Sequence, residues 1–176
     1  MLYKKFMFKP LVDNPKARAK YIILDNSVTV HMNGLITAGT TTANERTKYA
    51  IPVSTTSQKI LGVIIGYGKG EGGVPVEVSK MSASSLTTPS DNITGDKYGV
   101  WYIPASDRNV EYEATLDADA GTTAGSSGMG YFNIANDTTL DESTYVVATG
   151  TVGQFFSYGL VDGETDVVKV RIEKYL

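Results

Sequence analysis

Near its end the chain alternates apolar and charged side chains, and this pattern constrains the fold most strongly. Between Val168 and Glu173 the sequence reads VKVRIE. A period of two places alternate residues on opposite sides of an extended chain, so the pattern predicts a β-strand with one buried and one solvated face. The apolar and aromatic segment 154–161 precedes it, and residues 162–165 supply a turn. The sequence therefore predicts a C-terminal β-hairpin.

Short apolar or aromatic segments recur along the rest of the chain, separated by stretches rich in small polar residues and glycine. No segment longer than ten residues shows helical periodicity with caps, and many short strands at this spacing are typical of all-β folds. The fold class predicted is all-β, a single compact β-barrel or sandwich of about ten short strands with long polar loops. Strands are predicted at 20–24, 27–32, 49–53, 59–67, 75–78, 98–103, 110–116, 131–134, 145–148 and in the C-terminal hairpin, and loops at 37–46, 82–95 and 117–130.

Composition excludes several kinds of site. The chain has 176 residues, enough for one well-cored domain, and it has no cysteine and one histidine. Disulfide scaffolds, thiolate metal sites and multi-histidine metal sites are therefore excluded. No apolar run approaches 18 residues, so we expect no membrane partner. The run 59–67 (KILGVIIGY) is the most apolar in the chain, which favours a strand buried on both faces.

The first twenty residues carry six basic residues against one acidic residue, whereas acidic residues outnumber basic ones in the remainder. Pro10 and Pro15 break any long helix there. The sequence therefore predicts an extended basic N-terminal arm at 1–19 and a single β-rich domain at 20–176. Such an arm could dock on an acidic protein surface, or it could be a solvated terminus; nucleic acid is not expected as a partner. The predicted partner-binding residues are Leu2, Lys4, Lys5, Phe6, Phe8, Lys9, Leu11 and Arg18, with Met7 as a further apolar anchor.

No catalytic constellation is apparent. The glycine spacing at 68–73 (GKGEGG) matches a dinucleotide fingerprint, but a strand-like segment follows it instead of the required helix. His31 has no acidic neighbour in sequence, and no serine lies in a nucleophile-elbow context. Acidic groups at 117–119 and 162–166 could bind calcium but do not match the twelve-residue calcium loop. We therefore predict a protein that is not an enzyme and needs no cofactor or metal.

Four segments follow one another along the chain: KYIILDNSVTVHMNGLIT, KILGVIIGYG, YGVWYIPASDRNVEYEATL and GQFFSYGLVDGETDVVKVRIEKYL. Their order resembles that of the head-decoration (cement) and accessory structural proteins of tailed bacteriophages. The resemblance covers about residues 20–174 and rests on pattern, not on an exact motif. Two departures are a short turn (DGETD) before the last strand and the basic arm.

The resemblance implies a virion structural protein that binds the outside of the capsid and bridges major capsid protein subunits. It implies a homo-oligomer, with a trimer as the expectation, made in the bacterial cytoplasm and located on the capsid exterior. It carries no catalytic residues. Two alternatives remain open: another virion subunit of the tail or baseplate, or a carbohydrate- or calcium-binding β-sandwich. In the carbohydrate alternative, Tyr98, Trp101 and Tyr102 would form a stacking platform.

Overall fold

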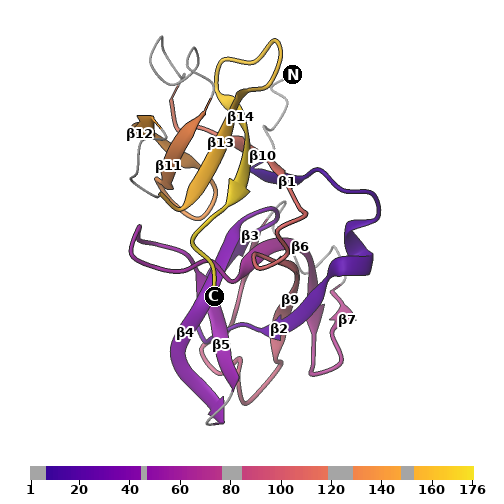
Figure 1. Cartoon of the computed structure of the whole chain (residues 1–176). Coiled ribbons are helices and arrows are strands. Elements are labelled where there is room, and N and C mark those ends of the chain that lie inside the picture. The colour runs from indigo at the N-terminus through magenta and orange to yellow at the C-terminus, as the bar shows by residue number, and fades with distance from the viewer. Residues whose placement is uncertain (1–6, 45–46, 77–84, 119–128, 148–152) are drawn as a thin grey trace, which may run out of the picture.

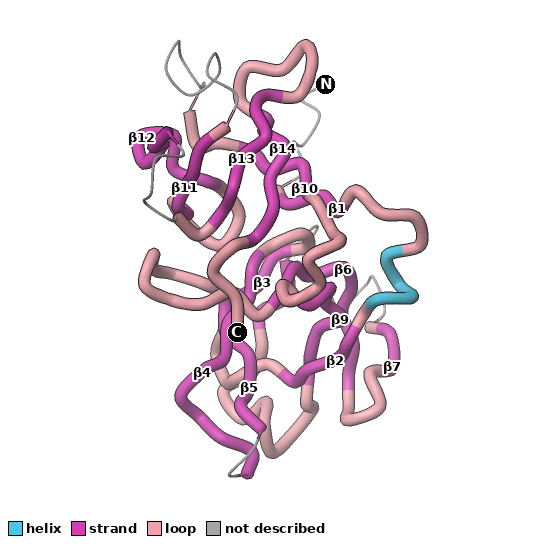
Figure 2. Tube along the Cα trace, in the orientation of Figure 1, coloured by secondary structure: helices cyan, strands magenta, loops and turns pink. Residues whose placement is uncertain are grey.

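The computed structural model of this chain describes residues 7–44, 47–76, 85–118, 129–147 and 153–176. These residues form β-strands and one short 3-10 helix, which confirms the all-β prediction (Figures 1 and 2). The elements in chain order are β1 (Phe8–Pro10), η1 (Pro15–Arg18), β2 (Lys20–Ile23), β3 (Thr29–His31), β4 (Leu35–Asn44), β5 (Thr47–Pro52), β6 (Gly62–Lys69), β7 (Val74–Pro75), β8 (Ser85–Thr87), β9 (Tyr98–Pro104), β10 (Tyr112–Thr115), β11 (Gly130–Ile134), β12 (Leu140–Val147), β13 (Phe155–Leu160) and β14 (Val167–Ile172).

One lobe of the molecule is an antiparallel sheet in the order β1-β10-β14-β13-β11-β12, here called the β13 sheet. It includes the predicted C-terminal hairpin, in which β13 pairs with β14. A bridge between Leu116 and Leu140, with the Asp117 amide donating to the Leu140 carbonyl, joins the end of β10 to β12. The sheet therefore curls around and nearly closes on itself, as the orange and yellow strands of Figure 1 show.

The other lobe is a sheet in the order β2-β9-β6-β4-β5, with β7 added to β6, here called the β6 sheet. It also curls, because Leu24 bridges to Ala50 and brings β2 back to β5. The small pair β3–β8 contributes Val30 and Leu86 to the interior of this lobe. In Figure 1 it is the lower, mostly purple and pink part of the molecule.

Side chains on the central strands of the β6 sheet point alternately into two hydrophobic cores. On β6, Val63 belongs to one core and Ile64 to the other, and on β9 Ile103 and Tyr102 divide in the same way. The first core, here called the shared core, combines the interior of the β13 sheet with the outer side of the β6 sheet. The second, the lower core, lies inside the β6 sheet. This arrangement explains why the run 59–67 is so rich in apolar residues, since Val63 and Ile64 on β6 are buried on opposite faces as predicted.

Gln154 links the two lobes through a buried amide. Its side chain is fully buried, and its oxygen accepts from the Ile134 amide in the β13 lobe. Its NH₂ group donates to the carbonyls of Thr55 and Gln58, in the loop before β6, at 3.4 and 3.1 Å. Because each polar atom of this amide has a partner, burial costs little here and fixes the relative position of the lobes.

Part of the predicted N-terminal arm is built into the fold. Residues Phe8–Pro10 form β1, which pairs antiparallel with β10 at the edge of the β13 sheet. The Phe8 side chain is fully buried and stacks on Phe155 with ring centroids 5.2 Å apart. Burying a phenylalanine contributes roughly 1.5–3 kcal/mol, which favours docking this segment over leaving it extended. From residue 8 onward the arm is therefore part of the body.

Two predicted loops contain strands. The segment 37–46 was expected to be a loop, but β4 continues through it as far as Asn44 and pairs with β5. Its many threonines are β-branched, and such residues favour a strand once a partner strand is present. Within 82–95, Ser85–Thr87 forms β8 against β3. Most of the predicted loop 117–130 lies outside the described residues.

Candidate binding surfaces

The predicted partner-binding residues of the N-terminal segment do not form one exposed row. Phe8 is a core residue instead of a surface anchor. Lys9 forms an ion pair with Glu113 at 3.3 Å, and Arg18 forms one with Asp107 at 2.6 Å. Leu11 is exposed, and Met7 packs against the shared core. Leu2, Lys4, Lys5 and Phe6 lie outside the described residues.

His31 has an acidic partner that its sequence neighbours do not supply. Its Nδ1 lies 3.0 Å from Oδ2 of Asp137, in the turn between β11 and β12. Ser85 is the cross-strand neighbour of His31. A serine nucleophile also needs a substrate cleft and oxyanion donors, and neither of the two pockets described in this chain is lined by His31 or Ser85. The pair instead joins β3 to the β13 lobe, where the Leu35 amide also donates to the Asp137 carbonyl.

The glycine run at 68–73 is a hairpin loop, because β7 follows it and pairs back onto β6. This outcome matches the expectation that no phosphate-binding helix follows the glycines. Within the described ranges, no group of three or more His, Asp or Glu side chains is placed to hold a metal ion.

The aromatic residues of β9 do not form a common platform. Tyr98 and Tyr102 lie on the side of the strand that faces the lower core, and Tyr102 is buried. Trp101 points to the opposite side, as strand alternation requires. The carbohydrate-stacking arrangement of these three side chains, considered as an alternative, is therefore not formed.

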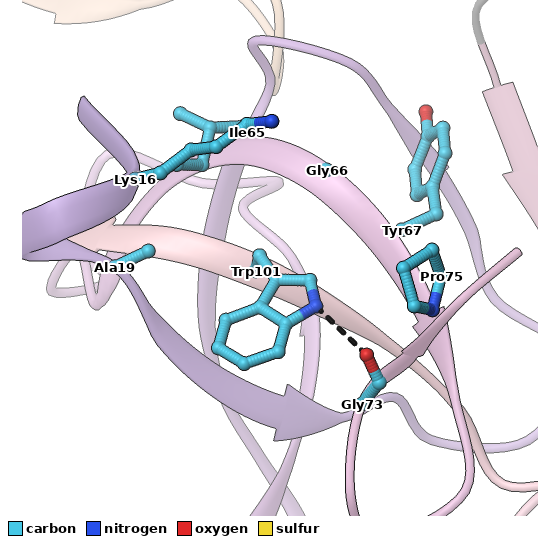
Figure 3. A pocket seen from close by; sticks show the side chains of 8 residues that line it. All are labelled: Lys16, Ala19, Ile65, Gly66, Tyr67, Gly73, Pro75 and Trp101. Carbon is cyan, nitrogen blue, oxygen red and sulfur yellow. Dashed lines mark hydrogen bonds between the residues drawn. The ribbon is translucent and has the colours of Figure 1, made fainter. Parts of the chain in front are cut away.

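Trp101 lines a pocket on the outside of the β6 sheet (Figure 3). The pocket has a volume of about 460 Å³ and lies between η1, β6, β7 and β9. A β-bulge between Ile64 and Gly66 shifts the register of β6 against β9 at this point, and bulges commonly redirect side chains beside functional sites. The residues that line the pocket are Lys16, Ala19, Ile65, Gly66, Tyr67, Gly73, Pro75 and Trp101.

The indole of Trp101 is held in place from two sides. Its N–H donates to the Gly73 carbonyl at 3.1 Å, drawn as a dashed line in Figure 3. The ring of Tyr21 packs against it with centroids 5.2 Å apart. Burial raises the pKa of the Tyr21 phenol to about 12, so this ring stays neutral at physiological pH. Trp101 is therefore fixed before any ligand arrives.

A second candidate surface is the outer face of the β13 sheet, here called the aromatic face. Across four adjacent strands, the paired positions are Val146, Tyr131, Phe156 and Arg171. The Phe156 ring contacts the rings of Tyr131 and Tyr158 edge-on, at 5.4 and 5.1 Å. Val146 in this row is an exposed apolar side chain, and so is Met129, which precedes β11. The sequence signal for this face is the alternation within 154–161, in which Phe156 and Tyr158 fall on the side opposite to Phe155.

Cations cover the rings of the aromatic face. Arg171 lies over Phe156 at 5.4 Å and Lys169 lies over Tyr158 at 5.7 Å. Both cations also bind carboxylates, Arg171 that of Glu173 and Lys169 that of Glu111. The hydrogen bond that Lys169 donates to the Glu111 carboxylate raises the pKa of the Lys169 ammonium. Both of these cations are thus already paired within the protein.

No protein-family model, no curated protein and no solved structure matches this chain. Among the described residues no helix is long and apolar enough to span a membrane. The site argument therefore depends on the chain's own geometry.

Proposed function

We propose that this protein is a non-catalytic virion structural protein that binds the outer surface of a tailed-phage capsid and bridges major capsid protein subunits. The observation that carries the proposal is the aromatic face. Tyrosine, phenylalanine and arginine are the residue types enriched at the centres of protein–protein interfaces. Here they lie side by side on one sheet surface, where exposed Val146 is the cross-strand neighbour of Tyr131.

Three further features support the proposal. The segment order resembles that of phage decoration proteins. The His31–Asp137 pair lies away from both described pockets, as set out above. A body of two lobes, joined by a shared core and the buried Gln154 amide, presents two separate surfaces that could contact neighbouring capsid subunits. Repetition of weak contacts over a lattice makes modest affinity per copy sufficient.

The proposal is tested by co-sedimentation with expanded capsids assembled from the major capsid protein of the same genome. We expect the wild-type protein to sediment with the capsids as a homo-oligomer, with a trimer as the expected state. Replacing Tyr131 and Phe156 together by alanine should weaken occupancy at least about tenfold, because truncated interface aromatics typically cost 2 kcal/mol or more.

The matched control is Tyr49→Ala, which removes a half-buried aromatic side chain from β5 in the other lobe. Circular dichroism and thermal melting confirm that each variant is folded. Equal occupancy by the double variant and the control would remove the aromatic face from the interface. Failure of the folded wild-type protein to bind capsids or virions at all would overturn the proposal.

A further inference from the structure

The space in the Trp101 pocket is kept open by a glycine. A Cβ added to Gly66 would meet only Trp101 side-chain atoms, at 3.7 and 3.9 Å, which is ordinary contact distance. Any larger residue there would occupy the volume above the indole. Gly73, which has φ +65°, lets the β6–β7 loop pass over the other end of the indole, where a Cβ would lie 2.7 Å from the ring. The pocket is thus preformed, and preformed sites bind without an ordering cost.

The chemistry of the pocket wall is apolar with a single cation at its edge. Ile65, Pro75 and the indole of Trp101 form the apolar surface, and Lys16 on η1 lies at the rim (Figure 3). The described lining includes no carboxylate.

Several basic residues near the pocket are paired with acids, whereas Lys16 and Lys20 are not paired in the described chain, and of these two only Lys16 lines the pocket. Lys9, Arg18 and Lys69 each form an ion pair. Lys16 is exposed, and no acidic group pairs with it in the part of the chain that the structure describes. An unpaired ammonium at the edge of a rigid apolar pocket favours a ligand with an apolar group that fills the pocket and an anionic group that lies near the ammonium.

We infer that the Trp101 pocket receives one apolar side chain from an acidic segment of a partner protein. A volume of about 460 Å³ suits a single anchoring side chain with its backbone better than an extended polymer. The tryptophan, already rigid, serves as the anchor site, and Lys16 binds a carboxylate that flanks the inserted side chain. The inference rests on the proposed function only for the identity of that partner, an acidic segment of the capsid surface.

The experiment uses Trp101 as its own reporter, since it is the one tryptophan in the chain. The full chain is titrated with the acetylated and amidated pentapeptide Asp-Glu-Leu-Asp-Glu while indole emission is recorded. We expect a saturable blue shift or intensity change, with a dissociation constant on the order of 1 mM for so small a probe. The peptides Asp-Glu-Gly-Asp-Glu and Lys-Lys-Leu-Lys-Lys, which lack the apolar side chain or the negative charge, should give no saturable change.

Two variants separate the roles of charge and space. Lys16→Glu should lower the affinity for the acidic peptide at least about tenfold, since one attractive contact becomes repulsive. Gly66→Ala should also weaken it by filling the space above the indole. Lys59→Glu, at an exposed lysine outside the pocket lining, is the matched control and should bind as the wild type does.

Absence of saturable binding by the leucine peptide would overturn the inference. Binding of the glycine or the lysine peptide with equal affinity would do the same, as would unchanged affinity of Lys16→Glu. Because this assay contains no capsid, its result is independent of capsid binding. Peptide binding by a protein that ignores capsids would keep the pocket assignment and overturn only the proposed function.

Discussion

The aromatic face of the β13 sheet and the Trp101 pocket of the β6 sheet both present aromatic rings, but they differ in how charge is arranged around them. On the aromatic face, Lys169 and Arg171 lie over rings and are paired with glutamates. At the pocket, Lys16 lies beside an indole with no paired acid in the described chain. The cations of the aromatic face are thus neutralised by carboxylates of the protein itself, whereas Lys16 at the pocket has no such partner in the described chain. The aromatic face suits broad contact by shape, and the pocket suits recognition of an anionic partner.

The comparison assumes that the two lobes form one cooperative body, and Phe155→Ala tests this assumption with the largest expected effect. Phe155 is fully buried in the shared core against Phe8. Removing its ring should lower the free energy of unfolding by about 3–5 kcal/mol. In urea denaturation, circular dichroism and Trp101 fluorescence should report one transition, shifted equally for both. A shift of the circular dichroism transition alone would show that the lobes unfold separately.

Gln154→Leu tests the polar link between the lobes. The substitution leaves the buried Ile134 amide and the carbonyls of Thr55 and Gln58 without this partner. We expect the free energy of unfolding to fall by about 2–3 kcal/mol, since one unsatisfied buried group typically costs about 1–3 kcal/mol. Urea denaturation measures this change in the free energy of unfolding. Gln58→Leu, which changes a side chain that binds only loop groups near Ser54, is the control and should cost less than about 1 kcal/mol. Equal losses would contradict a special role for Gln154.

A pair of glycine variants tests whether the pocket is preformed. Gly70 and Gly73 both have positive φ, but a Cβ at Gly70 would meet nothing within 4 Å whereas one at Gly73 would overlap Trp101. Gly70→Ala should therefore cost about 1–2 kcal/mol from backbone strain alone. Gly73→Ala should cost more and should also change Trp101 emission. Identical effects on stability and emission would contradict the close contact between this loop and the indole.

The smallest expected effects come from the surface charges. Arg171→Ala removes a partly buried ion pair and a cation over Phe156, so we expect the free energy of unfolding to fall by about 1 kcal/mol. Lys16→Ala removes a side chain with no such pairing and should leave thermal stability unchanged. A larger loss of stability for Lys16→Ala than for Arg171→Ala would contradict the assignment of Lys16 as unpaired and Arg171 as paired.

Local patterns in the sequence predicted those parts of the fold that depend on local physics. Alternation within 168–173 predicted β14, and the strongly apolar run 59–67 predicted a strand buried on both faces. The pair Asn33-Gly34 is typical of a hairpin turn. Asn33 has the positive φ of a tight turn, but the flanking strands β3 and β4 pair with β8 and with β5 and β6 instead of with each other. The small polar residues of 37–46 predict a loop, whereas the structure has a strand there. This part of β4 forms a strand because it pairs with β5, and that pairing cannot be recognised from composition.

Long-range contacts account for what the sequence could not predict. The partner of His31 is 106 residues away in Asp137, and Gln154 reaches groups 96 and 99 residues away. The sequence places Phe8 in the extended N-terminal arm, because nothing near it in sequence indicates that Phe155 stacks on it. The split of Trp101 from Tyr102, by contrast, follows from a period of two and was readable from the sequence.

The central claim, that this is a structural protein of the capsid exterior, is tested most directly by weighing expanded capsids before and after saturation with the purified protein. We predict that capsid mass rises to a plateau at a fixed number of copies per capsid subunit, and that the loaded capsids withstand higher temperature before they release DNA. An unchanged capsid mass at saturating concentrations of folded protein would contradict the account.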